Sequence, residues 1–154
     1  MLLTNKTLRK LELEGNKLGS KSAKEFGHAL MYNTTLKFLD LESNQLAPQE
    51  NSDTSAMTKF IEGVKNNTTL LVLNIANNQL GPEIGKEWCN CLAKNTTLID
   101  FEFGNNNFKL DDVRRIQEYL IRNRQAYDKA RLEEWRERKQ MRGELEDLEK
   151  LYLK

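Results

Sequence analysis

An α/β solenoid is the fold that the sequence predicts, with short parallel strands on a concave face, helices on a convex face and a charged C-terminal helix. Two observations predict the solenoid: a pattern of leucines and an asparagine recurs four times, and apolar residues at helical spacing follow each recurrence. A third observation, a rise in charge after residue 124, predicts the C-terminal helix. We therefore expect four repeats in residues 1–124 and a charged helical tail in residues 125–154.

Each repeat starts with the pattern Leu-x-x-Leu-x-Leu-x-x-Asn-x-Leu, in which isoleucine or phenylalanine replaces some of the leucines. The alternating apolar residues at its centre predict a short parallel strand with one face in the core. The second repeat is longer because of a polar, turn-prone stretch at residues 47–53, which we interpret as a loop insertion. The four copies start at Leu8, Leu36, Leu70 and Leu98, which lie 28, 34 and 28 residues apart.

An asparagine closes the strand half of each repeat. A buried amide can satisfy backbone donors and acceptors where the chain leaves the strand, which a leucine cannot do. We therefore expect these side chains to be buried and structural, and not catalytic. They are Asn16, Asn44, Asn78 and Asn106.

The second half of each repeat is expected to be a helix. Counting back from Asn33, and from the equivalent asparagine of each later repeat, apolar residues recur at steps of three and four, which places them on one helix face against the strands. Pro82 fits a first helical turn, and Gly19 and Gly81 mark the matching loop-to-helix position. The expected core sets are Ala23, Phe26 and Leu30; Met57, Phe60 and Val64; Gly85, Trp88 and Leu92; and Val113, Ile116 and Leu120.

The two ends of the array are expected to differ. After Asn123 the residues around Ala126 do not continue the strand pattern, so we expect the array to stop at four repeats. Leu2 precedes Asn5 by three residues, which is also the offset of Leu30 from the asparagine of the next repeat. We therefore interpret the chain as starting on the last turn of a preceding helix, within a longer array that would need its own polar cap.

The tail carries eight basic and eight acidic residues among residues 125–154. Acid-first pairs at helical spacing, such as Glu134 with Arg138, favour a helix. Two placements remain open: the tail folds back as a cap beside Phe103 and Phe108, or it projects and binds a helical partner. A short apolar seam favours the second placement near the end of the chain, at Met141, Leu145, Leu148 and Tyr152.

Composition excludes several classes of function. The formal net charge of +1 over 154 residues removes the electrostatic argument for a nucleic-acid or anionic-membrane partner. No apolar run approaches the roughly 20 residues that span a bilayer, and the N-terminal residues do not match the pattern of a secretory signal. We therefore expect a cytoplasmic protein. His28 lies off the expected core face, and Cys89 and Cys91 are expected to pack as small apolar residues. We therefore expect no metal site, no cofactor and no catalytic residues.

The concave strand face is the most informative surface. Neighbouring parallel strands lie about 4.8 Å apart, so its acids would stand side by side, which strand pairing does not favour. Together they form an acidic groove with an apolar centre, which suits a basic or amphipathic segment of a protein partner. The alternative is that the acids only keep an exposed sheet in solution. The expected groove consists of Glu12, Glu14, Phe38, Asp40, Glu42, Leu71, Val72, Asn74, Asp100 and Glu102.

These repeats resemble the leucine-rich repeats of the long, ribonuclease-inhibitor-like subclass, whose units pair a strand with a helix over about 28 residues. The stretch Asn95–Phe101 and the charged tail also look somewhat like tropomodulin-type and flagellar or ciliary repeat proteins. The resemblance implies a non-catalytic scaffold or adaptor, with a cytoskeletal or axonemal location. The alternative is a regulator of a small GTPase or a nuclease, although the equal charges of the tail differ from the acidic tail of the GTPase activator in this subclass.

Overall fold

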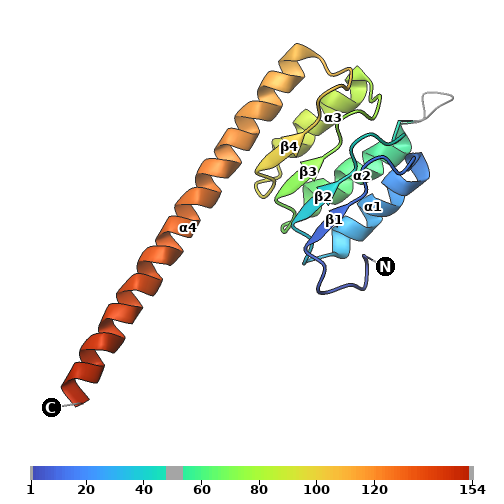
Figure 1. Ribbon diagram of the computed structural model, residues 1–154. Coiled ribbons are helices and arrows are strands. Elements are labelled where there is room, and N and C mark those ends of the chain that lie inside the picture. The colour runs from blue at the N-terminus through green and yellow to red at the C-terminus, as the bar shows by residue number, and fades with distance from the viewer. Residues whose placement is uncertain (1, 48–53, 153–154) are drawn as a thin grey trace.

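The computed structural model describes residues 2–47 and 54–152, so most of the expected loop insertion, at residues 48–53, lies outside the described residues. Four parallel strands form one sheet in chain order, and the helices that follow them lie on one side of it (Figure 1). This arrangement confirms the α/β solenoid. The strands are β1 (Lys10–Glu12), β2 (Phe38–Asp40), β3 (Val72–Asn74) and β4 (Asp100–Glu102), and the helices are α1 (Ser20–Tyr32), α2 (Ser55–Asn66), α3 (Pro82–Leu92) and α4 (Leu110–Tyr152).

The centre of the core is a row of aligned leucines. Leu11, Leu39 and Leu73 pair in register across β1 to β3, and Phe101 continues the row in β4. Leu39 and Leu73 are fully buried, whereas Leu11 at the outer strand is half-buried. Because burying a leucine side chain contributes about 1.5–3 kcal/mol, the inner repeats carry more of the stability than the first repeat.

Helices α1 and α3 begin where the sequence predicts. Gly19 and Gly81 are the N-cap residues of α1 and α3, and Pro82 occupies the first turn of α3. The expected core residues of α2 and α3 are all buried, and Trp88 is fully buried against Phe60 and Phe101. The sets of α1 and α4 are more open at their edges, where Phe26 in α1, and Val113 and Leu120 in α4, are half-buried.

The strand-end asparagines join each repeat to the preceding one. Asn44 Nδ2 donates to the Leu13 carbonyl at 2.9 Å, and its Oδ1 accepts from the Leu18 amide at 2.9 Å. Asn78 is fully buried with the same arrangement, and Asn106 is half-buried. The prediction is wrong for Asn16, which is exposed because no strand of the described chain lies outside β1.

A second column of buried asparagines runs through the turns between helix and strand. Asn67 Nδ2 donates to the carbonyls of Leu30 and Asn33 at 2.7 and 3.0 Å, and its Oδ1 accepts from the Leu70 amide at 2.7 Å. Asn33 makes the equivalent bond to the Leu2 carbonyl at 2.8 Å. Leu2 therefore occupies, before the first repeat, the position that Leu30 occupies before the second repeat, as its offset from Asn5 predicts.

Helices α1 and α2 approach each other at two glycines. A Cβ atom placed on Gly63 would lie 2.7 Å from Gly27 Cα and closer still to the Gly27 carbonyl oxygen. A Cβ atom placed on Gly27 would meet the Phe60 Cα at 2.7 Å. Only glycine fits at these two positions, because the obstacle on each side is backbone.

Two arginines of α4 close the C-terminal edge of the array. Arg124 Nε and Nη2 donate to the Ile99 carbonyl at 3.3 and 3.0 Å. In the preceding repeat the equivalent carbonyl, that of Leu71, accepts from the backbone amide of Ile99 at 2.9 Å. Arg124 thus takes the place of a following strand. Arg122 Nη2 similarly donates to the carbonyls of Leu92 and Asn95 at 2.9 and 3.0 Å.

Beyond Asn123, α4 continues as one helix and projects past the sheet (Figure 1). Side chains 128–142 are exposed, with exposed fractions of 46% for Leu132 and 56% for Trp135, so the tail adopts the projecting placement and not the folded-back cap. The expected ion pair between Glu134 and Arg138 forms at 3.0 Å. Side chains from residue 149 on, Tyr152 of the apolar seam included, lie outside the described residues, and the division at residue 124 falls inside α4 and stays a prediction.

Among the described residues, no helix is long and apolar enough to cross a membrane.

Candidate protein-binding face

The strands bring the expected groove residues together in two rows. Sheet register aligns the first row from Glu12 through Asp40 and Asn74 to Glu102. The second row runs from Lys10 through Phe38 and Val72 to Asp100. We call this surface the strand face and define it by these eight residues together with Glu14, Glu42 and Leu71. Its alignment follows the prediction, and its role in binding stays a prediction.

The two margins of the strand face carry cations as well as acids. Lys10 Nζ forms an ion pair with Glu12 at 2.7 Å at one margin. At the other margin, Arg124 of α4 pairs with Asp100 at 3.2 Å. The sequence does not reveal the second pair, because Arg124 reaches β4 only through the packing of α4 on the last repeat. Within the described residues, Glu12 and Asp100 are therefore partly neutralised, whereas Glu14, Asp40, Glu42 and Glu102 form no ion pair.

Glu42 is held in place by two amides of the next repeat. Its Oε2 accepts from Asn74 Nδ2 at 2.8 Å, and its Oε1 accepts from Asn77 Nδ2 at 3.0 Å. Asp40 is fixed in a different way, since its Oδ1 accepts from the Glu42 backbone amide at 2.9 Å. Glu14 and Glu102 are exposed and form no ion pair within the part of the chain that the structure describes.

Apolar side chains lie in the middle of the second row and beside it. Phe38, Leu71 and Val72 are half-buried, so part of each remains accessible to a partner. Lys10 Nζ stands 4.9 Å from the centroid of the Phe38 ring, a cation–π geometry that orients the ring at the β1 side. The strand face therefore combines an apolar centre with fixed carboxylates beside it.

The histidine and the two cysteines lie in surroundings that fit a structural role. His28 is exposed and contacts the Tyr32 ring edge-on at 5.5 Å. Cys89 and Cys91 are both buried, as expected, and burial raises the pKa of Cys91 to about 12, so this thiol is not poised as a nucleophile. Among the described residues, no group of three or more His, Cys, Asp or Glu side chains could hold a metal ion.

Comparisons with known proteins agree with this architecture. The leucine rich repeat family matches the chain over residues 4–27, 32–49 and 66–87. Together with the strand–helix repeats of the structure, this match shows the leucine-rich-repeat fold. No curated protein sequence matches the chain significantly.

Two solved structures share the fold. The structure of leiomodin-1 actin-binding site 2 is 23% identical with a TM-score of 0.76, covering 88% of this chain and 75% of that one. The tropomodulin C-terminal domain of Caenorhabditis elegans is 17% identical with a TM-score of 0.69, covering 85% of this chain and 74% of that one. At these identities the likeness concerns the fold, and it agrees with the tropomodulin-type resemblance of the sequence.

Proposed function

We propose that the chain is a non-catalytic protein-interaction module whose strand face binds a basic or amphipathic segment of a cytoskeletal protein. The observation that carries this proposal is the alignment of Glu12 with Asp40 on neighbouring parallel strands, with further carboxylates on the same face around an apolar centre. Like charges side by side on a sheet do not favour folding. A cationic partner would neutralise the repulsion between these carboxylates, and this relief would favour binding.

Glu42 is the residue best prepared to receive a cation. The two amide donors fix its carboxylate in one orientation, so little side-chain entropy remains to be lost on binding. Each carboxylate oxygen has a second lone-pair position, which an arginine or lysine of the partner can use. Phe38 and Val72 would then contact the apolar part of the same segment.

The cytoskeletal part of the proposal rests on the structural likeness. Leiomodin-1 carries the same fold in its actin-binding site 2, and tropomodulin carries it in its C-terminal domain. Actin is therefore the first partner to test, in its monomeric and filamentous forms. The comparisons lend no support to a ciliary location.

The test compares two double variants with the same change of net charge. Glu14→Lys with Glu102→Lys reverses two exposed carboxylates of the strand face that have no ion-pair partner among the described residues, so the fold should persist. Glu62→Lys with Glu87→Lys is the control on the helical side. Glu62 pairs with Lys59 at 2.9 Å, but an exposed pair contributes little to stability.

Association with actin, and capture of proteins from cell extract, are measured at low and high salt. The strand-face variant should associate about tenfold more slowly than the control at low salt, and the two should converge at high salt, because screening acts over a Debye length of about 8–10 Å. Equal binding by the two variants would show that the strand face is not the interface. Capture of a single GTPase or nuclease in place of filament proteins would reject the cytoskeletal assignment.

A further inference from the structure

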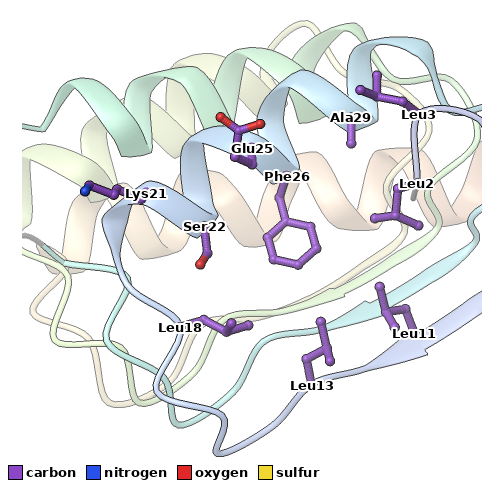
Figure 2. A pocket seen from close by; sticks show the side chains of 10 residues that line it. All are labelled: Leu2, Leu3, Leu11, Leu13, Leu18, Lys21, Ser22, Glu25, Phe26 and Ala29. Atoms are coloured by element: carbon purple, nitrogen blue, oxygen red, sulfur yellow. The ribbon is translucent and has the colours of Figure 1, made fainter.

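The N-terminal edge of the solenoid holds an open apolar pocket of about 460 Å³ between β1 and α1. Figure 2 shows Leu11 of β1, and Leu13 just after this strand, pointing toward Phe26 of α1, with Leu2 at the far end of the pocket. Apolar surface dominates the lining, and polar side chains line the pocket only along α1. This pocket is separate from the strand face, and the inference drawn from it does not depend on the proposed function.

The same repeat positions are closed in the inner repeats. Leu39, Leu41 and Leu46, the counterparts of Leu11, Leu13 and Leu18 in the second repeat, have exposed fractions of 0%. In the first repeat the three leucines are only half-buried. Apolar area left in water at an otherwise buried position favours association with a surface that removes it from water.

The opposite edge of the array is not available to fill this pocket. Arg124 occupies the Ile99 carbonyl, which a following strand would otherwise use, and α4 packs against β4. A second copy therefore cannot stack its C-terminal edge on β1 in the way that successive repeats stack. If a second copy covers the pocket, its own N-terminal edge must do so, which produces a closed two-fold dimer.

The charges along this edge complement themselves under such a rotation. Lys10 and Glu12 flank Leu11 in β1, and within one copy they form an ion pair with each other at 2.7 Å. When two β1 strands pair antiparallel with Leu11 opposite Leu11, each Lys10 faces the Glu12 of the other copy. On α1, Lys21 and Glu25 line the pocket one turn apart, so antiparallel α1 helices place unlike charges opposite each other as well.

We propose that two copies of this chain associate through their N-terminal edges, with β1 pairing antiparallel to β1 and the two apolar pockets closing against each other. The sheet then continues from one copy into the other, which covers the exposed strand edge of β1. The half-buried leucines of the first repeat become buried as their counterparts are in the second repeat. The two strand faces lie side by side in this dimer, and the two α4 helices stand at its outer ends.

The experiment measures the self-association of the full chain by analytical ultracentrifugation over a range of concentrations. Lys10→Glu and Glu12→Lys are tested singly and together. In the dimer, position 10 of each copy faces position 12 of the other, so each single variant creates two contacts between like charges. The double variant restores two contacts between unlike charges, with the acid and the base exchanged. Lys129→Glu and Glu146→Lys, on exposed positions of α4, are the controls with the same changes of charge. Circular dichroism of each variant reports whether it is folded.

We expect a concentration-dependent dimer whose dissociation constant rises about tenfold in each single variant, which is about 1.4 kcal/mol, and returns close to the original value in the double variant. The α4 controls should leave it unchanged. A chain that stays monomeric throughout would overturn the proposal and would leave the pocket to a preceding repeat or to another protein. A dimer that the β1 variants do not weaken, or one that the α4 controls weaken instead, would also overturn it.

Discussion

Replacing Gly63 by alanine tests the close approach of α1 and α2. The added methyl group would lie 2.7 Å from Gly27 Cα, with the Gly27 carbonyl nearer still, and backbone cannot rotate away as a side chain can. The two helices must therefore separate. Overpacking of this kind costs about 1–3 kcal/mol, and the rigid obstacle places Gly63→Ala near the upper value.

Two opposing contributions determine the net effect. Alanine is about 1 kcal/mol better than glycine inside a helix, which reduces the loss of stability to about 2 kcal/mol. For a chain of this length, such a loss lowers the melting temperature by about 4–8 °C. Urea denaturation followed by circular dichroism measures the free energy of unfolding directly, and calorimetry measures the melting temperature.

Gly85→Ala is the matched control. A Cβ atom at this position would meet the ring of Phe108 at 2.8 Å, and this half-buried side chain can turn aside. The gain in helix propensity should then roughly cancel the contact, and the stability should change by less than about 1 kcal/mol. Equal effects of the two substitutions, or a stabilised Gly63→Ala, would refute the close approach of the two helix backbones.

Four further predictions concern single positions. Leu73→Ala, at a fully buried site, should cost about 2–5 kcal/mol in urea denaturation, and Leu8→Ala, at the half-buried outer repeat, should cost clearly less. Ser43 has a φ of 53°, so Ser43→Asn should stabilise the chain by about 0.5–1 kcal/mol in thermal unfolding, because asparagine tolerates this left-handed conformation better than serine does. Arg124→Ala removes the bonds to Ile99 and should cost about 1 kcal/mol, and Arg124→Lys should recover only part of this loss in the same assay. Burial raises the pKa of Cys91 from 9.0 to about 12, so the thiol loses its proton at a lower pH in the unfolded chain than in the folded one. The free energy of unfolding of the natural chain should therefore fall toward that of Cys91→Ala as the pH rises from 9 toward 12, as measured by urea denaturation at each pH.

The features that recur in every repeat could be predicted from the sequence. The positions of the four strands, their parallel register and the apolar faces of the helices repeat in every unit, so each unit supports the prediction for the others. The row from Glu12 through Asp40 and Asn74 to Glu102 could be aligned for the same reason.

Features formed by a single contact between distant residues could not be predicted. Arg124 reaches Ile99 and Asp100 only because α4 packs on the last repeat, and nothing in the sequence near Arg124 indicates this. The two amides on Glu42 and the contact of Gly27 with Gly63 likewise depend on the spacing between repeats. The burial of Asn33 and its equivalents had a visible signal, since an Asn-x-Thr tripeptide recurs at this position in every repeat.

The asparagine columns make the cooperativity of folding directional. Asn44 and Asn67 satisfy backbone groups of the repeat before them, so no single repeat completes its own hydrogen bonding and each depends on its neighbour. The ends of the chain then differ in how readily they open. At β4 the arginines of α4 supply the missing partners, whereas β1 is the outermost strand of the described residues. Unfolding of a single copy is therefore expected to start at the first repeat and to advance toward α4.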